Sequence, residues 1–185
     1  MGRLDGAIAI VTGGSRGIGK GCAIEIAMAG ADIVLNDRPE SPDLEQTTAE
    51  IRALGRVCHA IEEDVFSRAG CERFVAAAIA AAGHVDILVS NPAFSRRGAF
   101  LDYDPELFQK TIEGTLTSGF HMSQLIARHM VERAQGGKIV FISSVQAEMP
   151  TSLCVAYGAA KAGLNHMMRC IAVELVPHRI NVNAI

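Results

Sequence analysis

Short apolar runs alternate with longer amphipathic stretches along almost the whole chain, and this alternation constrains the fold more than any other feature. The apolar runs predict six strands, at 7–11, 31–35, 57–61, 86–89, 138–142 and 179–185. Apolar residues at helical spacing predict the helices between them, at 17–29, 41–54, 67–82, 105–133 and 155–176. Nearly continuous apolar strands separated by helices are typical of a parallel sheet covered on both faces. We therefore expect an α/β fold with a doubly wound sheet in three layers.

Local signals mark several helix ends. Ser41 and Pro42 predict the start of the second helix, as its N-cap and its first helical residue, and Gly83 predicts the end of the third. In the long helix at 105–133, apolar residues recur every four positions and predict one apolar face. They are Phe108, Ile112, Leu116 and Phe120.

The composition fits one globular domain, which we assign to residues 1–185, ending within the sixth strand. The net charge of −3 and the lack of a basic block argue against a nucleic-acid partner. No stretch is long and apolar enough for a membrane span and the amino terminus has no signal core, so we expect a cytoplasmic protein. Five scattered cysteines predict reduced, buried thiols, and the six histidines form no metal-binding motif.

The first strand leads into a glycine-rich segment, Thr12–Gly19. Gly13 permits a tight turn, Gly17 lets the backbone approach a pyrophosphate, and Gly19 lets the following helix pack on the strand. The N–H groups and the dipole at the helix start favour phosphate. The place of this loop between a strand and a helix predicts a dinucleotide site, with a glycine turn that binds nothing as the alternative. We also assign Ser15, Arg16 and Ile18 to the lining of this site.

The end of the second strand bears on the choice of cofactor. Asp37 follows Gly19 at about the spacing expected for a carboxylate that binds the adenosine ribose. Such a carboxylate repels a 2′-phosphate and so favours NAD. Arg16 and Arg38 could pair with that phosphate, which keeps NADP as the alternative. For Arg38, a solvated turn residue is an equally good interpretation.

Tyr157 and Lys161 form a Y-x-x-x-K pattern near the start of a predicted helix, and this spacing places both side chains on one face. A free tyrosine titrates near ~10, and a lysine ammonium one turn away stabilises the phenolate. The pair can therefore exchange a proton with an alcohol or a carbonyl. Ser144 ends the fifth strand, where ligands bind in parallel sheets, and could polarise a substrate oxygen. A surface Tyr–Lys pair and a turn-capping serine are the structural alternatives.

The glycine loop, Asp64 with Val65 after the third strand, Ser144 and the Tyr157–Lys161 pair together resemble the short-chain dehydrogenase/reductase family in order and spacing. The resemblance covers essentially the whole chain. It implies a Rossmann-like fold and hydride transfer between a nicotinamide cofactor and an alcohol or ketone. It further implies that the tyrosine is the general acid/base, that the lysine holds the ribose, and that the serine orients the substrate oxygen.

The resemblance also implies positions for other residues. Asp64 and Val65 would line the adenine site, and Asn91 the adjoining cofactor wall. The helices at 105–133 and 155–176 would pair across a two-fold axis, giving a homodimer or a homotetramer. Within the family, the sequence is loosely similar to glucose 1-dehydrogenases and 3-oxoacyl-carrier-protein reductases.

Three departures from the family pattern favour an alternative, a nucleotide-binding regulator or redox sensor without catalysis. Ser90-Asn91-Pro92-Ala93 replaces the usual N-N-A-G. Thr115 replaces the usual catalytic asparagine, whose main-chain carbonyl holds a relay water. The chain ends at Ile185, where the family continues, so we expect a piece of a longer protein, with a naturally truncated protein as the alternative. The intact serine, tyrosine and lysine favour an enzyme.

Overall fold

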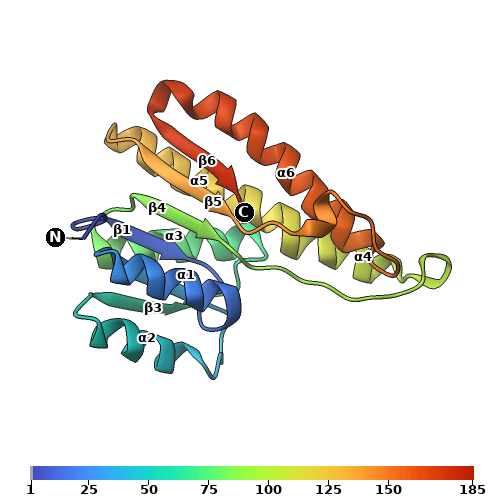
Figure 1. Cartoon of the computed structure of the whole chain (residues 1–185), viewed down its shortest axis with the longest axis horizontal. Coiled ribbons are helices and arrows are strands. Elements are labelled where there is room, and N and C mark those ends of the chain that lie inside the picture. The colour runs from blue at the N-terminus through green and yellow to red at the C-terminus, as the bar shows by residue number, and fades with distance from the viewer. Residues whose placement is uncertain (1) are drawn as a thin grey trace.

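Six parallel strands form a sheet in the order β3-β2-β1-β4-β5-β6 (Figure 1). The computed structural model describes residues 2–185. The strands are β1 (Ile8–Val11), β2 (Asp32–Asp37), β3 (Cys58–Glu62), β4 (Ile87–Ser90), β5 (Gly137–Phe141) and β6 (Ile180–Ala184). The chain enters at β1 in the middle of the sheet, winds outward to β3, and then returns to the other side of β1 at β4. This reversal confirms the doubly wound topology.

Helices cover both faces of the sheet, which confirms the three-layer arrangement. They are α1 (Gly17–Met28), α2 (Leu44–Ala53), α3 (Arg68–Ala82), α4 (Pro105–Ile112), α5 (Ser118–Arg133) and α6 (Val155–Leu175). One core cluster joins α3, α5 and α6 to alternate strand residues such as Ile10, and the other joins α1 and α2 to their neighbours, Ala9 and Val11. Because β1 is buried on both faces, its sequence is a continuous apolar run.

The predicted ends of α3 are confirmed, and the predicted start of α2 is wrong. Ser67 caps α3 by accepting a hydrogen bond from the Gly70 N–H (3.0 Å), and Gly83 ends it with a φ of 82°. Helix α2 begins at Leu44, not at Pro42. The Ser41 hydroxyl instead donates to Ser15 Oγ (3.1 Å), so a contact with the glycine loop replaces the expected cap.

The single helix expected at 105–133 is also a wrong prediction, since a π-helical turn at Glu113–Thr117 separates α4 from α5. The Ser118 N–H bonds to the carbonyl of Glu113, five residues back. Gly114 allows this turn to approach Phe66, whose nearest ring atom would lie 2.6 Å from an added Cβ. This close approach is a tertiary contact, and the spacing of apolar residues along the chain does not predict the turn. Such turns are frequent at functional sites.

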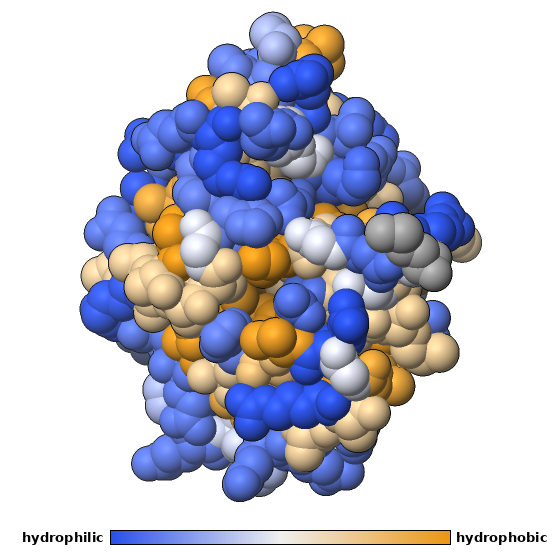
Figure 2. Space-filling model, turned by 90° about the vertical axis from the view of Figure 1, so that its left-hand side faces the viewer, coloured by the Kyte–Doolittle hydropathy of each residue, from blue (hydrophilic) through white to orange (hydrophobic). Residues whose placement is uncertain are grey.

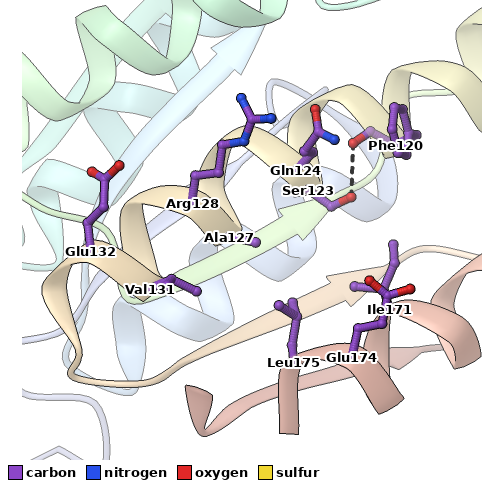
Figure 3. A pocket seen from close by; sticks show the side chains of 10 residues that line it. All are labelled: Phe120, Ser123, Gln124, Ala127, Arg128, Val131, Glu132, Ile171, Glu174 and Leu175. Carbon is purple, nitrogen blue, oxygen red and sulfur yellow. Dashed lines mark hydrogen bonds between the residues drawn. The ribbon is translucent and has the colours of Figure 1, made fainter. Parts of the chain in front are cut away.

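The apolar stripe expected on the long helix faces the core only in part, because Leu116 packs against the first core cluster. Phe108 and Phe120 are 38% and 41% exposed, whereas Met122 and Ile126 are buried. Beside this stripe, α5 and α6 form a groove of about 340 Å³ (Figure 3). Its lining consists of Phe120, Ser123, Gln124, Ala127, Arg128, Val131, Glu132, Ile171, Glu174 and Leu175.

The two ends of the sheet differ in character. In Figure 1 the strands run from left to right, and three short 3₁₀ helices accompany them, η1 (Phe100–Asp102), η3 (Val145–Ala147) and η4 (Val176–His178). Figure 2 shows the end at which the strands begin, where hydrophobic residues lie in groups between hydrophilic ones. The predicted site residues lie at the opposite end. Within residues 2–185, no helix is both long and apolar enough to cross a membrane.

Candidate functional site

The candidate site lies at the carboxyl ends of the strands, where the strand order reverses between β1 and β4. Thr12 is fully buried there. Its hydroxyl donates to the Val89 carbonyl (3.2 Å) and accepts from the Asn91 N–H (3.2 Å). The Asn91 side chain donates back to the carbonyls of Thr12 (3.2 Å) and Gly13 (2.8 Å). Because ligands of doubly wound sheets bind at this reversal, Asn91 stands in a position to form the wall of a cofactor cleft.

The glycine loop has the conformation that its composition requires. Gly13 and Gly17 adopt φ values of 58° and 57°, which glycine adopts without steric cost. No atom lies within 4 Å of a Cβ added at Gly17, so the backbone there faces open space. At Gly19 an added Cβ would lie 2.2 Å from the Gly13 carbonyl oxygen and 2.6 Å from Asn91 Nδ2. Gly19 therefore lets α1 approach the loop itself, and not the strand as expected.

Other residues of the loop divide into exposed and buried ones. Arg16 occupies the N-cap position of α1 with an exposed side chain, and Ile18 is 65% exposed one residue into the helix. Ser15, by contrast, is 1% exposed. Its N–H (3.3 Å) and its hydroxyl both donate to Asp37 Oδ2. Ser15 thus shapes the loop through Asp37, whereas the start of α1 beyond it remains open to an anion.

Asp37 ends β2 beside the glycine loop and is half-buried. Its Oδ1 accepts the Arg38 N–H at 2.7 Å, while Oδ2 accepts from Ser15. These bonds fix the direction of the carboxylate and leave further lone pairs for hydroxyl donors. The Arg38 side chain is exposed.

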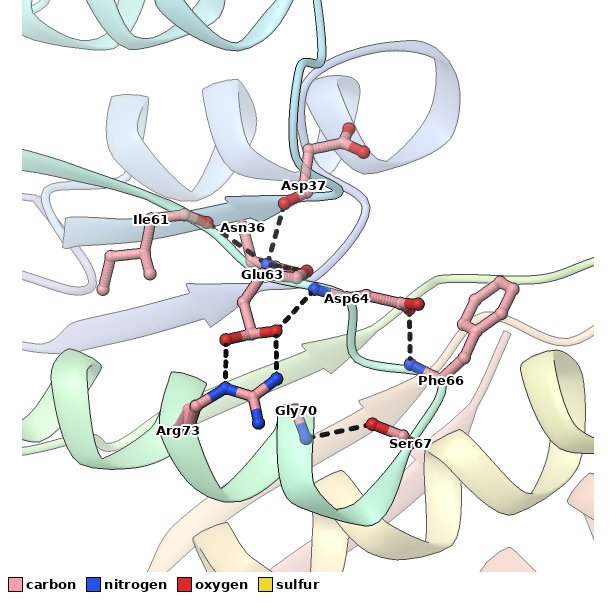
Figure 4. Close-up of polar contacts among 9 residues, drawn as sticks. All are labelled: Asn36, Asp37, Ile61, Glu63, Asp64, Phe66, Ser67, Gly70 and Arg73. Atoms are coloured by element: carbon pink, nitrogen blue, oxygen red, sulfur yellow. Dashed lines mark hydrogen bonds and ion pairs between the residues drawn. The ribbon is translucent and has the colours of Figure 1, made fainter.

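A polar network joins the ends of β2 and β3 to α3 (Figure 4). Asn36 is 1% exposed, and its amide donates to the carbonyls of Asp37 (3.2 Å), Ile61 (3.2 Å) and Glu63 (3.1 Å). Glu63 accepts two bonds from Arg73, each 2.8 Å long. Because these bonds anchor both strand ends, the wall that follows β3 is held in place from two sides.

Asp64 and Val65 form that wall in different ways. Asp64 is exposed, and its Oδ1 accepts the Phe66 N–H at 3.0 Å. Val65 is 5% exposed and its side chain belongs to the core, so only its backbone can face a cofactor. The sequence placed both residues at the adenine site without this distinction.

Thr115 lies in the π-helical turn and is 2% exposed. Its hydroxyl accepts the Phe94 N–H (3.1 Å) and donates to the Phe94 carbonyl (2.9 Å). The Thr115 side chain therefore secures the loop that follows β4, which contains Pro92 and Ala93. This leaves the main-chain carbonyl as the group by which Thr115 could serve a proton relay.

Ser144 follows the end of β5, and Tyr157 and Lys161 lie on α6, which bonds to the same strand end through Lys161. Ser144 is half-buried, as is Tyr157 in the first turn of α6. Lys161 is 2% exposed, and its Nζ donates to the Ile142 carbonyl at 2.5 Å and lies 5.6 Å from the Tyr157 ring centroid. Burial lowers the pKa of Lys161 to about 8. The lysine is still mostly protonated at neutral pH, so it places a poorly screened positive charge beside the phenol.

These groups fit a dinucleotide. The backbone at Gly17, where α1 begins, borders open space, and a fixed carboxylate, Asp37, stands beside the loop. A half-buried phenol and a buried ammonium lie on the other side of the strand-order reversal. The fold and the site together define a Rossmann-like, nucleotide-binding oxidoreductase.

Comparison with known proteins narrows this class to a family. The model of the short chain dehydrogenase family matches residues 7–185, and the chain belongs to this family. An L-rhamnose 1-dehydrogenase (NAD(P)(+)) of Sphingomonas is 35% identical, over 98% of this chain and 72% of that protein. The 2-dehydro-3-deoxy-D-gluconate 5-dehydrogenase of Escherichia coli is 36% identical, over 98% and 71%. The crystal structure of a carveol dehydrogenase from Mycobacterium avium, in complex with NAD, superposes with a TM-score of 0.94 at 31% identity and covers 100% of this chain and 71% of that one.

The family membership confirms the main functional predictions. The protein is an NAD(P)-dependent oxidoreductase that transfers a hydride between a nicotinamide cofactor and a small alcohol or ketone. The alternative of an inactive regulator has no support.

Sequence reasoning missed several residues that shape the site. Asn36 and Arg73 anchor the segment that follows β3, and Asn165 on α6 bonds to Ser143 at 2.5 Å. A polar residue ending a buried strand was an available signal for Asn36. Arg73 and Asn165 meet their partners only in three dimensions, so no spacing marks them.

Proposed function

We propose that Tyr157 is the general acid/base of this oxidoreductase and that Lys161 supports it. The observation that carries the proposal is the burial of Lys161 on the same face of α6 as the tyrosine, with its ammonium 5.6 Å from the phenol ring. A positive charge at this place stabilises the phenolate. The same ammonium would hold the cofactor ribose.

In alcohol oxidation, the substrate hydroxyl binds between Ser144 and Tyr157. Tyr157 takes the hydroxyl proton while the carbon–hydrogen bond breaks, and in the reverse direction it returns the proton to the carbonyl oxygen. Ser144 donates a hydrogen bond to the same oxygen and is far too weak a base to replace the phenol. The nicotinamide, when bound, accepts or supplies the hydride. Thr115 would contribute only through its main-chain carbonyl, as a partner for a relay water.

We propose further that the cofactor is NAD in preference to NADP. The phosphates would lie on Gly13, Gly17 and the start of α1, with the adenine along the wall at Asp64. The fixed carboxylate of Asp37 supports this preference, because it accepts ribose hydroxyls and repels a 2′-phosphate. The exposed side chains of Arg16 and Arg38 favour NADP as the second candidate.

The substrate class that we propose is a small polyhydroxylated compound. Two of the relatives described above are named for sugar or sugar-acid substrates. A panel of sugars, sugar acids, polyols, hydroxysteroids and 3-oxoacyl esters, followed by NADH absorbance, tests this directly. Turnover confined to the steroids or the acyl esters would contradict the carbohydrate assignment while leaving the reaction type intact.

We propose that the face formed by α5 and α6 pairs with a second copy of the chain, giving a homodimer or a homotetramer. Phe120 and Val173 are 41% and 74% exposed on these helices, and half of the ten side chains that line the groove between the helices are apolar. Light scattering should show at least a dimer, and Phe120→Glu should shift the protein toward the monomer. A wild-type monomer at micromolar concentration would contradict the proposal.

We also propose that residues 1–185 form one domain and that the protein works in the cytoplasm. The two core clusters share one sheet, which supports a single unit. All five cysteines are free thiols, which suits a reducing compartment.

A further inference from the structure

The corner that follows β5 carries Ser144, and its position decides where that hydroxyl points. The backbone there is extended, with φ −162° and ψ 149° at Ser144. Ser144 also caps η3, because its Oγ accepts the Gln146 N–H at 3.2 Å. The Ser143 N–H donates to the Ile185 carbonyl at 2.6 Å, which ties the corner to the end of β6. None of these bonds links the corner to α6, which carries Tyr157.

Helix α6 supplies that link through two side chains. Lys161 Nζ donates to the Ile142 carbonyl at 2.5 Å, just before the corner. One turn later, Asn165 Oδ1 accepts from the Ser143 hydroxyl at 2.5 Å. The spacing of Tyr157, Lys161 and Asn165 places all three side chains on one face of the helix.

Asn165 also reaches the far side of the corner. Its Nδ2 lies 3.5 Å from Glu148 Oε1, just beyond η3. The amide therefore contacts the chain both before and after Ser144. An amide carries both acceptor and donor groups, which suits a serine hydroxyl on one side and a carboxylate on the other. A hydroxyl side chain is too short to bridge two partners in this way.

We propose that Asn165 is a positioning residue that acts through Ser144, and this rests on the role proposed above for Ser144. By holding the corner against α6, Asn165 fixes the separation of the Ser144 hydroxyl and the Tyr157 phenol, which must both reach one substrate oxygen. A misplacement of about 1 Å in such a pair can lower the rate on the order of 10²-fold. Asn165 itself makes no contact with the reacting atoms.

The test is a double-mutant cycle in the full chain, with the best alcohol from the panel as substrate. Asn165→Leu removes both hydrogen bonds and should lower kcat by roughly 10–100-fold. In a Ser144→Ala background the same change should have little further effect, because the hydroxyl that it positions is gone. The Kd for NAD should stay within about twofold of wild type. His166→Ala, an exposed neighbour on α6, is the matched control and should leave kcat unchanged.

Ser143→Ala provides a second route if Asn165→Leu does not fold, as judged by thermal unfolding. It removes the hydroxyl donor of the 2.5 Å bond to Asn165 and should cause a similar loss of kcat. Combining Ser143→Ala with Asn165→Leu should cause no further loss. Equal losses from Asn165→Leu with and without Ser144 would overturn the proposal, as would wild-type kcat in Asn165→Leu. A Ser144→Ala variant with wild-type turnover would instead refute the role of Ser144, and the positioning role with it.

Discussion

The two halves of the sheet build their parts of the site by different means. In the half formed by β1, β2 and β3, the cleft consists mainly of backbone, glycines and short polar side chains such as Ser15 and Asp37. In the half formed by β4, β5 and β6, it consists of side chains on separate elements, brought together by burial. The Lys161 ammonium shows this in one bond, because it is buried and donates to the Ile142 carbonyl at the end of β5.

This difference has consequences for tolerance to change. The cofactor half depends on space, because an added methyl group meets backbone atoms at Gly19. The half in which we propose catalysis depends on the charge of Lys161, which is held in a buried place where a charge is unfavourable. Substitutions in the first half should therefore impair binding, and those in the second should impair turnover or alter stability.

The largest effect should come from Tyr157→Phe. Removal of a positioned acid/base lowers the rate on the order of 10²–10⁴-fold, so kcat should fall by at least about 10²-fold. The affinity for NAD, measured by calorimetry, should be nearly unchanged, because the cofactor half is intact. Near wild-type turnover would show that the proton leaves by another route.

The next effect concerns the cost of burying Lys161. Its pKa falls from 10.5 to about 8 on folding, so the unfolded chain binds more protons between these two pH values. The native protein should therefore gain stability as the pH rises through this window, by on the order of 3 kcal/mol. The Lys161→Met variant should not show this rise in stability with pH, because methionine has no group that titrates.

Urea unfolding of both proteins at pH 7 and pH 10 measures the difference. The stability of the wild type relative to Lys161→Met should increase at the higher pH. A difference that does not change with pH would mean that the lysine is not desolvated. Turnover of Lys161→Met should be lost at both pH values.

A smaller effect should follow from Gly19→Ala. The new Cβ overlaps the Gly13 carbonyl and the Asn91 amide, and overpacking of this kind costs about 1–3 kcal/mol. The affinity for NAD should fall by roughly 10–100-fold as the loop shifts. Gly21→Ala is the matched control on the same helix, where no atom lies within 4 Å of an added Cβ. An equal loss in both variants would show that helix α1 as a whole, and not the contact at Gly19, sets the affinity.

The smallest effect expected is that of Asp37→Ala on cofactor choice. Loss of a carboxylate that binds ribose hydroxyls should narrow the preference for NAD over NADP by roughly tenfold, about 1.5 kcal/mol. Titration of each cofactor measures the ratio, with Glu45→Ala, an exposed carboxylate on α2, as the control. A wild-type protein that prefers NADP would assign the choice to Arg16 and Arg38.

Sequence prediction succeeded where the signal was local. The buried strands, the glycine loop and the capped helix at Ser67–Gly83 each follow from short patterns that fix backbone geometry. It failed at Ser41 and in the long helix, where a side chain or a turn bonds to a distant segment. The outward direction of Phe108 and Phe120 was likewise not predictable, because periodicity defines an apolar face and not the surface that covers it.

The sequence by itself determined the fold class and the family, and it indicated the groups that we propose to react. These depend on residue types at fixed spacing, such as the glycines of the loop and the four-residue interval between Tyr157 and Lys161. Only the tertiary structure decided which side chains are buried and which of them fix other residues by hydrogen bonds. It also decided how the π-helical turn places Thr115. The physical reason is that burial and long-range hydrogen bonds arise between segments far apart in the chain, so no local pattern encodes them.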